Sequence, residues 1–134
     1  MSEEFLDAPY LAVKVAMMPR DTNPHGTIFG GVVLSYIDQA GAIGARHALR
    51  SRGWPERMIV TVAMNRVEFH QPVFVGDVVS FTTSVRRIGT TSITVHVDVE
   101  ADRDGLPVKL TEADVTYVAV SDVSGGRTPV PLRP

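Results

Sequence analysis

Apolar residues recur at helical spacing in one segment of the chain, which runs from about Ile28 to Leu49. Several positions on the apolar face are small, so we expect this helix to pack closely against another element, such as a sheet. Gly53 and Pro55 follow the segment and are expected to stop the helix. The predicted packing face consists of Val33, Ile37, Ala40, Gly41, Gly44, Ala45 and Ala48.

Elsewhere apolar and polar residues alternate with a period of two, which indicates strands. The alternation is strict from Thr91 to Ala101, so we expect one face of that strand to be buried and the other to be polar. Short links join most of these segments, which favours an antiparallel sheet with the helix on one face. The predicted strands cover residues 10–18, 58–69, 78–88, 91–101 and 108–120.

The length of 134 residues is that of one domain, so we expect residues 1–134 to share a single core. The final segment, residues 122–134, contains several prolines and glycines and is predicted to be a loose tail. One helix of about 20 residues does not cover the buried face of a five-stranded sheet, and the sheet would keep an unpaired edge. We therefore expect two copies of the chain to pair edge to edge in a homodimer.

Composition and charge restrict the classes of partner. Hydrophobic residues make up 44% of the chain, charged residues 21%, and the net charge is −2, so nothing favours binding to nucleic acid or to an anionic membrane. The absence of cysteine excludes disulfides, a thiolate nucleophile and a cysteine-based zinc site. The N-terminal segment is acidic, and no apolar run approaches the roughly 18 residues of a membrane span. We expect a cytoplasmic protein.

A glycine pair, Gly30-Gly31, stands at the start of the predicted helix. The first N–H groups of a helix have no partner within it, and glycine lets a ligand oxygen approach the backbone closely. The pair is therefore a candidate oxyanion site. The alternative is a helix entry that needs unusual dihedral angles or tight packing.

Two polar side chains near this pair are candidates for catalysis. Asp38 is the only acidic residue between Asp21 and Glu56, and its helical neighbours are apolar or small, so it is a candidate base or nucleophile. The alternative is an exposed carboxylate at the rim of the apolar stripe. Asn23 precedes a proline in the loop before the helix, where it either bonds its own backbone or orients a substrate carbonyl or a water.

The histidines do not follow a metal-binding pattern. His47, His70 and His96 lie far apart in the chain without the spacing of metal ligands, and we expect each to have a structural role. No metal site is therefore predicted.

The spacing of Gly30 and Asp38 limits how they can work together. Eight residues of helix separate them, which is about 12 Å along the helix axis. A water held by Asp38 would lie too far from the N–H groups at the start of its own helix to attack a carbonyl bound there. Either the two features are unrelated, or the helix of a second subunit brings its Asp38 to the glycines of the first.

Three stretches of the chain resemble one family: DTNPHGTIFGGVVLSYIDQAGAIGA, VTVAMNRVEFHQPVFVGDVVSF and GTTSITVHVDVEA. The chain is similar to the hotdog-fold acyl-CoA thioesterases, most closely the cytosolic or brain acyl-CoA hydrolase group, from about Met17 to Val120. The resemblance implies an α+β hotdog fold, in which a curved antiparallel sheet of five to six strands wraps a long central helix. It also implies a homodimer with one continuous sheet, and a hexamer built as a trimer of dimers.

The resemblance assigns roles to individual residues. Asp38 matches the family's helical carboxylate and Asn23 its loop amide, and the two come from opposite subunits in one composite site. Gly30 and Gly31 match the glycines whose N–H groups polarise the thioester carbonyl. Thr61 lies on the strand where the family has a small polar residue near the site. Contacts to coenzyme A fall in the strand-turn-strand region, at Arg87, Gly89, Thr90, Thr91 and Ser92.

The predicted reaction is hydrolysis of an acyl-CoA to a carboxylic acid and coenzyme A, as part of fatty acid metabolism. Asp38 acts as a general base on water or, alternatively, as a nucleophile through an anhydride. No metal or redox cofactor is expected. Acyl-CoA is the expected partner, and neither nucleic acid nor a membrane is one.

Two other functions fit the same fold. A non-catalytic acyl-CoA sensor would lack a positioned base and would usually carry an effector segment, whereas this chain has both Asp38 and Asn23. A thioesterase for acyl-carrier-protein or aromatic acyl-CoA would differ only in substrate, and a basic surface patch near the pocket would favour the carrier protein. Many relatives have His-Gly-Gly where this chain has Phe29-Gly30-Gly31, which argues against phenylacetyl and hydroxybenzoyl substrates and favours fatty acyl groups.

Overall fold

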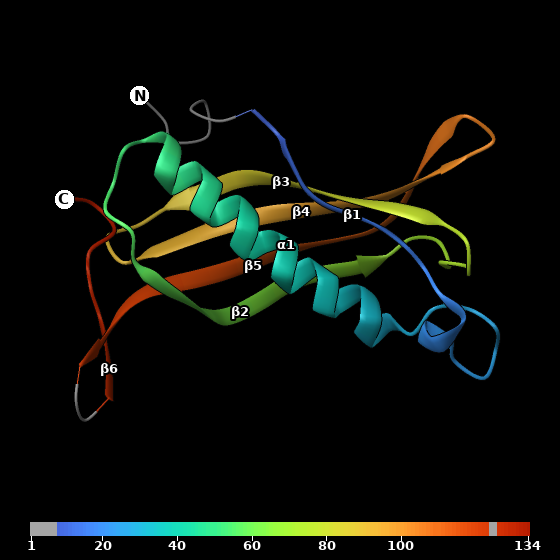
Figure 1. The fold of residues 1–134 in the computed structure, drawn as a ribbon, viewed down its shortest axis with the longest axis horizontal. Helices are drawn as coiled ribbons and strands as arrows, with labels where there is room; N and C mark the ends of the chain where they lie inside the picture. Colours follow the sequence, from blue (N-terminus) through green and yellow to red (C-terminus); the bar gives the residue numbers. More distant parts are fainter. Residues whose placement is uncertain (1–7, 124–125) are drawn as a thin grey trace.

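A computed structural model describes residues 8–123 and 126–134 of the chain. One long helix, α1 (Gly30–Ser51), crosses one face of a single sheet (Figure 1). The helix begins two residues later than predicted and ends before Gly53, which adopts a positive φ of 71°. Within the described residues, no helix is both long and apolar enough to cross a membrane.

The sheet is antiparallel throughout, with the strand order β1-β3-β4-β5-β2 and with β6 paired to β5. The predicted arrangement of one helix on one face of an antiparallel sheet is therefore confirmed, with a sixth strand added. The strands are β1 (Tyr10–Ala16), β2 (Met58–Phe69), β3 (Val78–Ile88), β4 (Ser92–Arg103), β5 (Leu106–Val123) and β6 (Gly126–Pro129). A short 3-10 turn, η2 (Pro19–Asp21), links β1 to the loop before α1.

The core lies between α1 and the sheet face that the helix covers. Strand β4 shows the alternation expected of it, because Ile93, Val95, Val97 and Val99 are fully buried on this face. Most of its polar residues on the opposite face are partly exposed. His96 is the exception, since only 8% of its surface is exposed.

Small residues let α1 approach the sheet closely, as the sequence predicts. A Cβ added at Gly44 would overlap the side chain of Thr83 on β3. A Cβ added at Gly41 would likewise overlap the hydroxyl of Tyr117 on β5. The two glycines, which weaken a helix by about 1 kcal/mol each relative to alanine, therefore make room for polar side chains of the sheet.

The C-terminal segment is not a loose tail in its described part, so that prediction is wrong for residues 126–134. Strand β6 pairs with the end of β5, and beyond it Val130 N donates to Ala119 O at 2.9 Å. Leu132 N donates to Thr90 O at 2.9 Å, and its side chain is only 1% exposed. The prolines and glycines suggested a loop, but the apolar residues between them fill a gap at the edge of the core.

Strand β2 forms one edge of the main path of the sheet. It is 12 residues long and carries exposed apolar side chains, among them Val62 and Phe69, each 55% exposed. A long strand edge with exposed apolar side chains favours pairing with another strand. This feature agrees with the edge-to-edge homodimer that we expect from the sequence.

Candidate active site

The loop before α1 is organised by the side chain of Asn23. Its Oδ1 accepts hydrogen bonds from His25 N at 2.9 Å and Thr27 N at 3.2 Å, while its Nδ2 donates to Thr27 Oγ1 at 2.8 Å. These are the local backbone bonds of an Asx turn, one of the two roles considered for this residue. The amide nitrogen carries two hydrogens, and Thr27 takes one of them.

The glycine pair stands at the first positions of α1. The helical hydrogen bonds begin with Val32 N and Val33 N, which both donate to Phe29 O, at 3.0 and 3.3 Å. The N–H groups of Gly30 and Gly31 precede these bonds, as expected at a helix start. A cavity of about 230 Å³ opens beside Gly30, between the helix and the end of β2. Among the described residues neither N–H group has a hydrogen-bond partner, and Gly30 lines this cavity whereas Gly31 lines a separate hollow with Asp21 and Ser35.

An aromatic side chain covers Gly30 on the sheet side. A Cβ added at Gly30 would lie 3.4 Å from Cζ of Phe69, the last residue of β2. An added Cβ at Gly31 would have no neighbour within 4 Å among the described residues. Gly30 is thus in close contact with β2, whereas Gly31 faces open space.

Two hydroxyl groups hold the carboxylate of Asp38, which is partly buried in the middle of α1. Thr61 Oγ1, on β2, donates to Asp38 Oδ1 at 2.8 Å. Tyr117 Oη, on β5, donates its single hydrogen mainly to the backbone oxygen of Asp38, at 2.7 Å, and shares it with Oδ1 at 3.3 Å. Thr61 is therefore brought together with Asp38, as the sequence resemblance implies, while Tyr117 was not predicted.

The contact of Tyr117 with Asp38 could not be predicted from the sequence, because 79 residues separate the two. In the sequence pattern Tyr117 is an ordinary core residue of its strand. Burial, followed by the negative charge of Asp38, raises the pKa of the Tyr117 hydroxyl. The hydroxyl therefore stays protonated at neutral pH and acts as a donor. The pairing of Thr61 with Tyr117 across β2 and β5 explains how both reach the same carboxylate oxygen.

The predicted coenzyme A segment forms the turn between β3 and β4. Gly89 N donates to Ser92 O at 2.7 Å, and Thr91 O accepts from Ala119 N at 2.8 Å, so the turn is tied to β5. Ile93, which follows the turn, pairs with Tyr117. The turn thus lies at the end of the sheet next to the strand positions that hold Asp38.

Arg87 lies apart from the turn between β3 and β4 and lines a hollow of about 440 Å³ on the sheet. Arg66 and Arg86 line the same hollow, and Arg66 has a positive φ of 54°, which is uncommon for a residue with a side chain. Asp114 lines it as well and lies 3.9 Å from Arg86 Nε, so one carboxylate partly offsets the three guanidinium groups. Guanidinium groups suit phosphate, because each offers several donors in a fixed plane.

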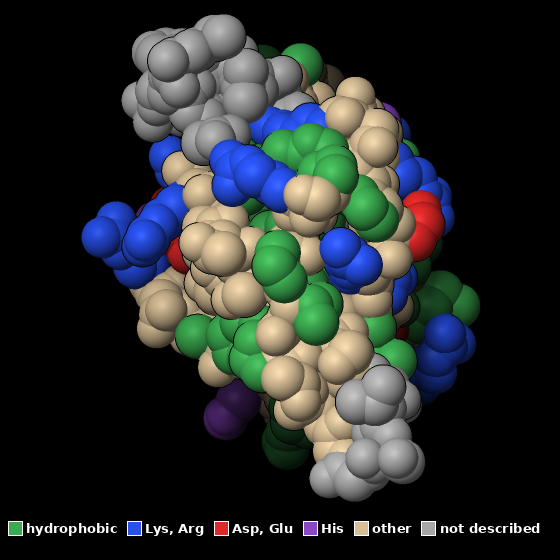
Figure 2. All heavy atoms as spheres, turned by 90° about the vertical axis from the view of Figure 1, so that its left-hand side faces the viewer, with side chains coloured by type: hydrophobic (Ala, Val, Ile, Leu, Met, Phe, Trp, Pro, Cys, Tyr) green, Lys and Arg blue, Asp and Glu red, His purple; other side chains and the backbone are tan. Residues whose placement is uncertain are grey.

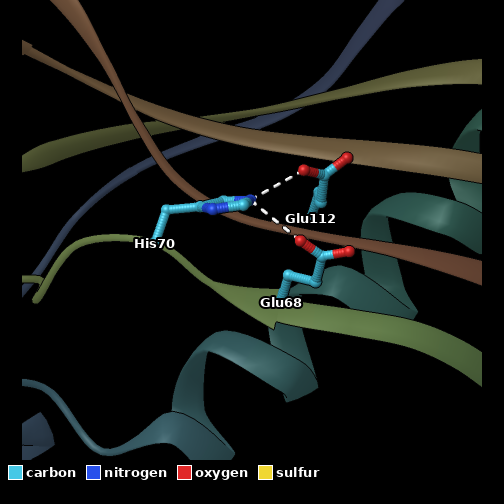
Figure 3. Close-up of side chains that lie close together, drawn as sticks. All are labelled: Glu68, His70 and Glu112. Carbon is cyan, nitrogen blue, oxygen red and sulfur yellow. Dashed lines mark hydrogen bonds and ion pairs between the residues drawn. The ribbon is translucent and has the colours of Figure 1, made fainter.

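A second cluster of ionisable residues lies on the sheet face opposite α1. Glu112 Oε2 is 2.7 Å from His70 Nε2, and Glu68 lies 3.8 Å from the same histidine nitrogen (Figure 3). Lys109 Nζ lies 2.9 Å from Glu112 Oε2. Glu112 Oε1 is 3.2 Å from His96 Nε2, which links the two histidines through one carboxylate. His70 and His96 are far apart in the sequence, and the pairing of the strands places both beside Glu112.

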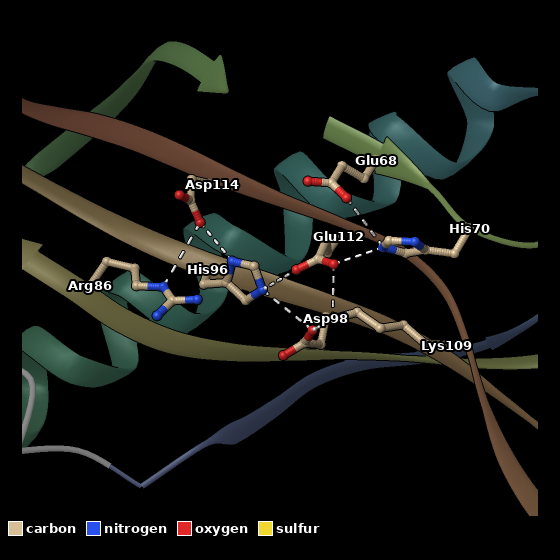
Figure 4. Close-up of polar contacts among 8 residues, drawn as sticks. All are labelled: Glu68, His70, Arg86, His96, Asp98, Lys109, Glu112 and Asp114. Carbon is tan, nitrogen blue, oxygen red and sulfur yellow. Dashed lines mark hydrogen bonds and ion pairs between the residues drawn. The ribbon is translucent and has the colours of Figure 1, made fainter. Parts of the chain in front are cut away.

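The cluster continues along β4 and β5 (Figure 4). His96 Nδ1 lies 2.6 Å from Asp114 Oδ1, and its Nε2 lies 3.3 Å from Asp98. Lys109 also reaches Asp98, at 3.2 Å. Two groups of donor atoms could ligate a metal, Glu68 with His70 and Glu112, and His96 with Asp98 and Glu112. Here the ammonium of Lys109 already bonds two of these carboxylates.

Replacing Glu112 by glutamine is expected to remove an acid-sensitive contribution to stability. Hydrogen bonds from Lys109 and His70 lower the pKa of Glu112 from 4.5 to about 2. A carboxylate with a depressed pKa stabilises the fold fully above about pH 5 and loses this effect as the pH falls towards 2. We therefore expect Glu112→Gln to be less stable than wild type at pH 7, by an amount that shrinks towards pH 3.

Urea unfolding at the two pH values measures this difference. Glu100→Gln, on β4 outside the cluster, is the matched control and should show no comparable pH dependence. An equal loss of stability for Glu112→Gln at both pH values would show that the loss comes from packing and not from charge.

Basic side chains surround apolar ones at the end of the molecule where α1 finishes (Figure 2). Trp54 lies between two of them, with the guanidinium carbons of Arg52 and Arg133 at 5.7 and 4.9 Å from a ring centroid. The same end carries the β3–β4 turn, because Leu132 bonds Thr90 there. This end of the molecule therefore presents positive charge close to the predicted coenzyme A segment.

Comparisons with known proteins agree on one family. Residues 25–108 match the model of the Thioesterase superfamily. Acyl-CoA thioester hydrolase YciA of Salmonella typhimurium is 38% identical over 128 residues, covering 92% of this chain and 91% of that protein. Among solved structures, Cj0915 of Campylobacter jejuni, a hexameric hotdog fold thioesterase, is 42% identical with a TM-score of 0.75, over 90% of each chain.

A third relative has been solved with ligands. The acyl-CoA hydrolase of Staphylococcus aureus, in complex with butyryl coenzyme A and coenzyme A, is 30% identical with a TM-score of 0.73. The match covers 89% of this chain and 70% of that one. Variants of that hydrolase in which an asparagine or an aspartate is replaced by alanine have also been solved, and the two positions are 15 residues apart. Asn23 and Asp38 have the same separation.

Proposed function

The chain belongs to the thioesterase superfamily, and from this premise we propose that it hydrolyses the thioester bond of acyl-CoA. The fold of one helix on an antiparallel sheet is the hotdog fold of its relatives. The observation that carries the proposal is the carboxylate of Asp38, which two hydroxyl groups hold on the helix beside an open strand edge. A carboxylate held in this way is suited to act as a base.

Asp38 supplies the base and the start of α1 supplies the oxyanion site. Asp38 takes a proton from a water molecule as the water oxygen bonds to the thioester carbonyl carbon. The N–H groups of Gly30 and Gly31 stabilise the negative charge that develops on the carbonyl oxygen. The carbon–sulfur bond then breaks, and the sulfur of coenzyme A takes up the proton.

In the alternative, the Asp38 carboxylate attacks the carbonyl carbon, and the carbon–sulfur bond breaks to give an anhydride and the thiolate of coenzyme A. Water then hydrolyses the anhydride, which releases the acid and the free Asp38 carboxylate, and the thiolate takes up the proton. In both versions the chain supplies the reacting groups, so the proposed reaction uses no metal or redox cofactor.

Two copies joined along β2 would bring these groups together. In one copy Thr61 bonds Asp38, while Phe69 lies against Gly30 eight residues further along the same strand. Antiparallel pairing of two β2 strands about a twofold axis near Asn65 places Thr61 of one copy beside Phe69 of the other. Asp38 of one copy then faces Gly30 of the second, although about 12 Å of helix separates these residues within one copy.

Asn23 is proposed to orient the water or the thioester carbonyl with the second hydrogen of its amide nitrogen. Its remaining bonds hold the loop that leads into the glycine pair. The equal separation of an asparagine and an aspartate in the Staphylococcus aureus hydrolase supports Asn23 and Asp38 as a functional pair. In the dimer that we propose, the two would come from opposite subunits.

For coenzyme A itself, we propose contacts from Arg87 and from the turn that contains Gly89, Thr90, Thr91 and Ser92. The three guanidinium groups of the hollow at Arg87 match the charge and geometry of phosphate. The positive charge at the neighbouring end of the molecule would also attract the anionic coenzyme during encounter. Relatives solved with coenzyme A support this class of ligand.

The assembly proposed is a trimer of dimers, supported by relatives described as hexameric thioesterases, Cj0915 and y2039 of Yersinia pestis. Closeness to the cytosolic or brain hydrolase group, a cytoplasmic location and a role in fatty acid metabolism stay predictions. The named relatives are bacterial acyl-CoA thioester hydrolases.

One observation favours a second candidate substrate, an acyl group on a carrier protein. The basic end of the molecule shown in Figure 2 would attract an acidic protein as well as the phosphates of coenzyme A. A non-catalytic acyl-CoA sensor is the remaining alternative, and the positioned carboxylate of Asp38 argues against it.

Release of free thiol from a panel of substrates tests the proposed function. The panel contains short, medium and long acyl-CoAs, an aromatic acyl-CoA and an acyl-carrier-protein. We expect hydrolysis of fatty acyl-CoA, with slower release from the carrier protein and from the aromatic thioester. Binding of acyl-CoA without thiol release would contradict the enzyme and favour the sensor, while preference for the carrier protein would change the substrate class.

A further inference from the structure

Tyr117 places its hydroxyl group on the one carboxylate that the proposed function uses. The side chain is 1% exposed and projects from β5 towards α1. Its oxygen lies 2.7 Å from the backbone oxygen of Asp38 and 3.3 Å from Oδ1. One buried group therefore contacts both the main chain and the side chain of Asp38.

The helix has an opening for this hydroxyl. Gly41 lies three residues after Asp38 and therefore on the same side of α1. A Cβ at this position would overlap the Tyr117 oxygen and would lie 3.2 Å from Cζ of the ring. Glycine weakens the middle of a helix by about 1 kcal/mol relative to alanine, so a specific requirement for space explains its presence. Gly41 and Tyr117 thus form one unit of structure.

Both hydroxyl donors reach the same carboxylate oxygen. Thr61 and Tyr117 approach Oδ1 from two neighbouring strands, at 2.8 and 3.3 Å. Tyr117 shares its one hydrogen with the backbone oxygen of Asp38, so it ties the carboxylate to the helix backbone and restricts its rotation. Among the described residues, the hydrogen bonds to this side chain all end on Oδ1, which leaves Oδ2 to accept a proton from water. Thr61 is exposed beside the open edge of β2, whereas Tyr117 is enclosed by the core.

We propose that Tyr117 is a positioning residue for Asp38, and that Gly41 is a glycine so that the Tyr117 hydroxyl can reach it. The inference rests on the proposed function, because it treats Asp38 as the base. Tyr117 does not touch the substrate in this account. It fixes the rotation of the carboxylate so that Oδ2 points at the water, and its buried hydroxyl cannot be replaced by solvent.

Tyr117→Phe removes the hydroxyl and leaves the ring in place. We expect kcat for acyl-CoA hydrolysis to fall about tenfold with KM unchanged within about twofold, because binding groups are untouched. A purely structural role would appear as lower thermal stability and not as a fall in kcat per folded enzyme at unchanged KM. Tyr10→Phe is the matched control, because the Tyr10 ring stacks on His47 away from Asp38.

Gly41→Ala displaces the hydroxyl without deleting it. We expect this variant to lose kcat by a similar factor, and the double variant Gly41→Ala with Tyr117→Phe to be no slower than either single variant. If the kcat of the double variant fell by the product of the two single losses, Gly41 and Tyr117 would act independently, and the proposal that they form one unit would be overturned. A kcat for Tyr117→Phe equal to that of wild type would overturn the positioning role.

A crystal structure of Tyr117→Phe gives a readout that does not depend on activity. We expect the Asp38 carboxylate in more than one orientation in this variant, and in a single orientation in a crystal structure of wild type. A single unchanged orientation would overturn the proposal even if wild type hydrolysed no acyl-CoA. Absence of hydrolysis by wild type, by contrast, would contradict the proposed function alone.

Discussion

Asp38→Asn is expected to lower kcat/KM for acyl-CoA hydrolysis by a factor of about 100 or more. Asparagine has nearly the same shape as aspartate, and its Oδ1 can still accept hydrogen bonds from Thr61 and Tyr117. It cannot take a proton from water, so the loss falls on the chemical step. Thiol release at saturating and at low acyl-CoA concentration separates this loss from any change in binding.

Asp104→Asn is a suitable control for Asp38→Asn, because it makes the same change of side chain away from the proposed active site. Asp104 lies in the turn between β4 and β5 with a positive φ of 55°, a conformation that asparagine adopts readily. This variant should keep the activity of wild type. Activity of Asp38→Asn within a few-fold of wild type, with the same oligomeric state, would show that Asp38 is neither base nor nucleophile.

Gly31→Pro is expected to reduce kcat by a factor of about 100 to 1,000 while leaving the fold intact. Proline is tolerated in the first turn of a helix, where its missing N–H has no helical partner. Gly30, which precedes it, has no Cβ to clash with the proline ring. The variant therefore removes one proposed oxyanion donor and few other interactions.

Gly31→Ala distinguishes the effect of the lost N–H group from the effect of added side-chain bulk. Alanine keeps the N–H group, and its Cβ would meet no atom within 4 Å among the described residues. We expect this variant to retain most of the activity and the same thermal stability. Equal losses of kcat in the two variants would assign the effect of Gly31 to crowding of the substrate and not to its N–H group.

The helix and most strands could be predicted because their signals are local. The change of hydrophobic period from 3.6 to 2 marks the end of α1, and the strict alternation in β4 predicts its buried face. Asp38 could be identified as a candidate from its apolar helical neighbours, whereas Thr61 could be identified only through resemblance to a family. Their contact joins residues 23 positions apart, which no local pattern encodes.

Interactions that depend on strand register could not be predicted. Tyr117 meets Asp38 only because β5 lies beside β2 under the middle of α1. The contacts of His70 and His96 with Glu112 likewise need three strands in one register. The prediction of a loose tail for the C-terminal segment was wrong for a related reason. Its prolines indicate a loop, but the burial of Leu132 against distant parts of the chain fixes where this loop packs.

Two subunits share the proposed active site, with Asp38 from one and Gly31 from the other. Co-expression of Asp38→Asn and Gly31→Pro chains tests this arrangement directly, because each mixed dimer would contain one site free of both substitutions. Random assembly of equal amounts should restore thiol release from acyl-CoA to about one quarter of wild type, far above either variant alone. Activity of the mixed assembly no higher than that of the separate variants would place both residues in sites within single subunits and contradict the account.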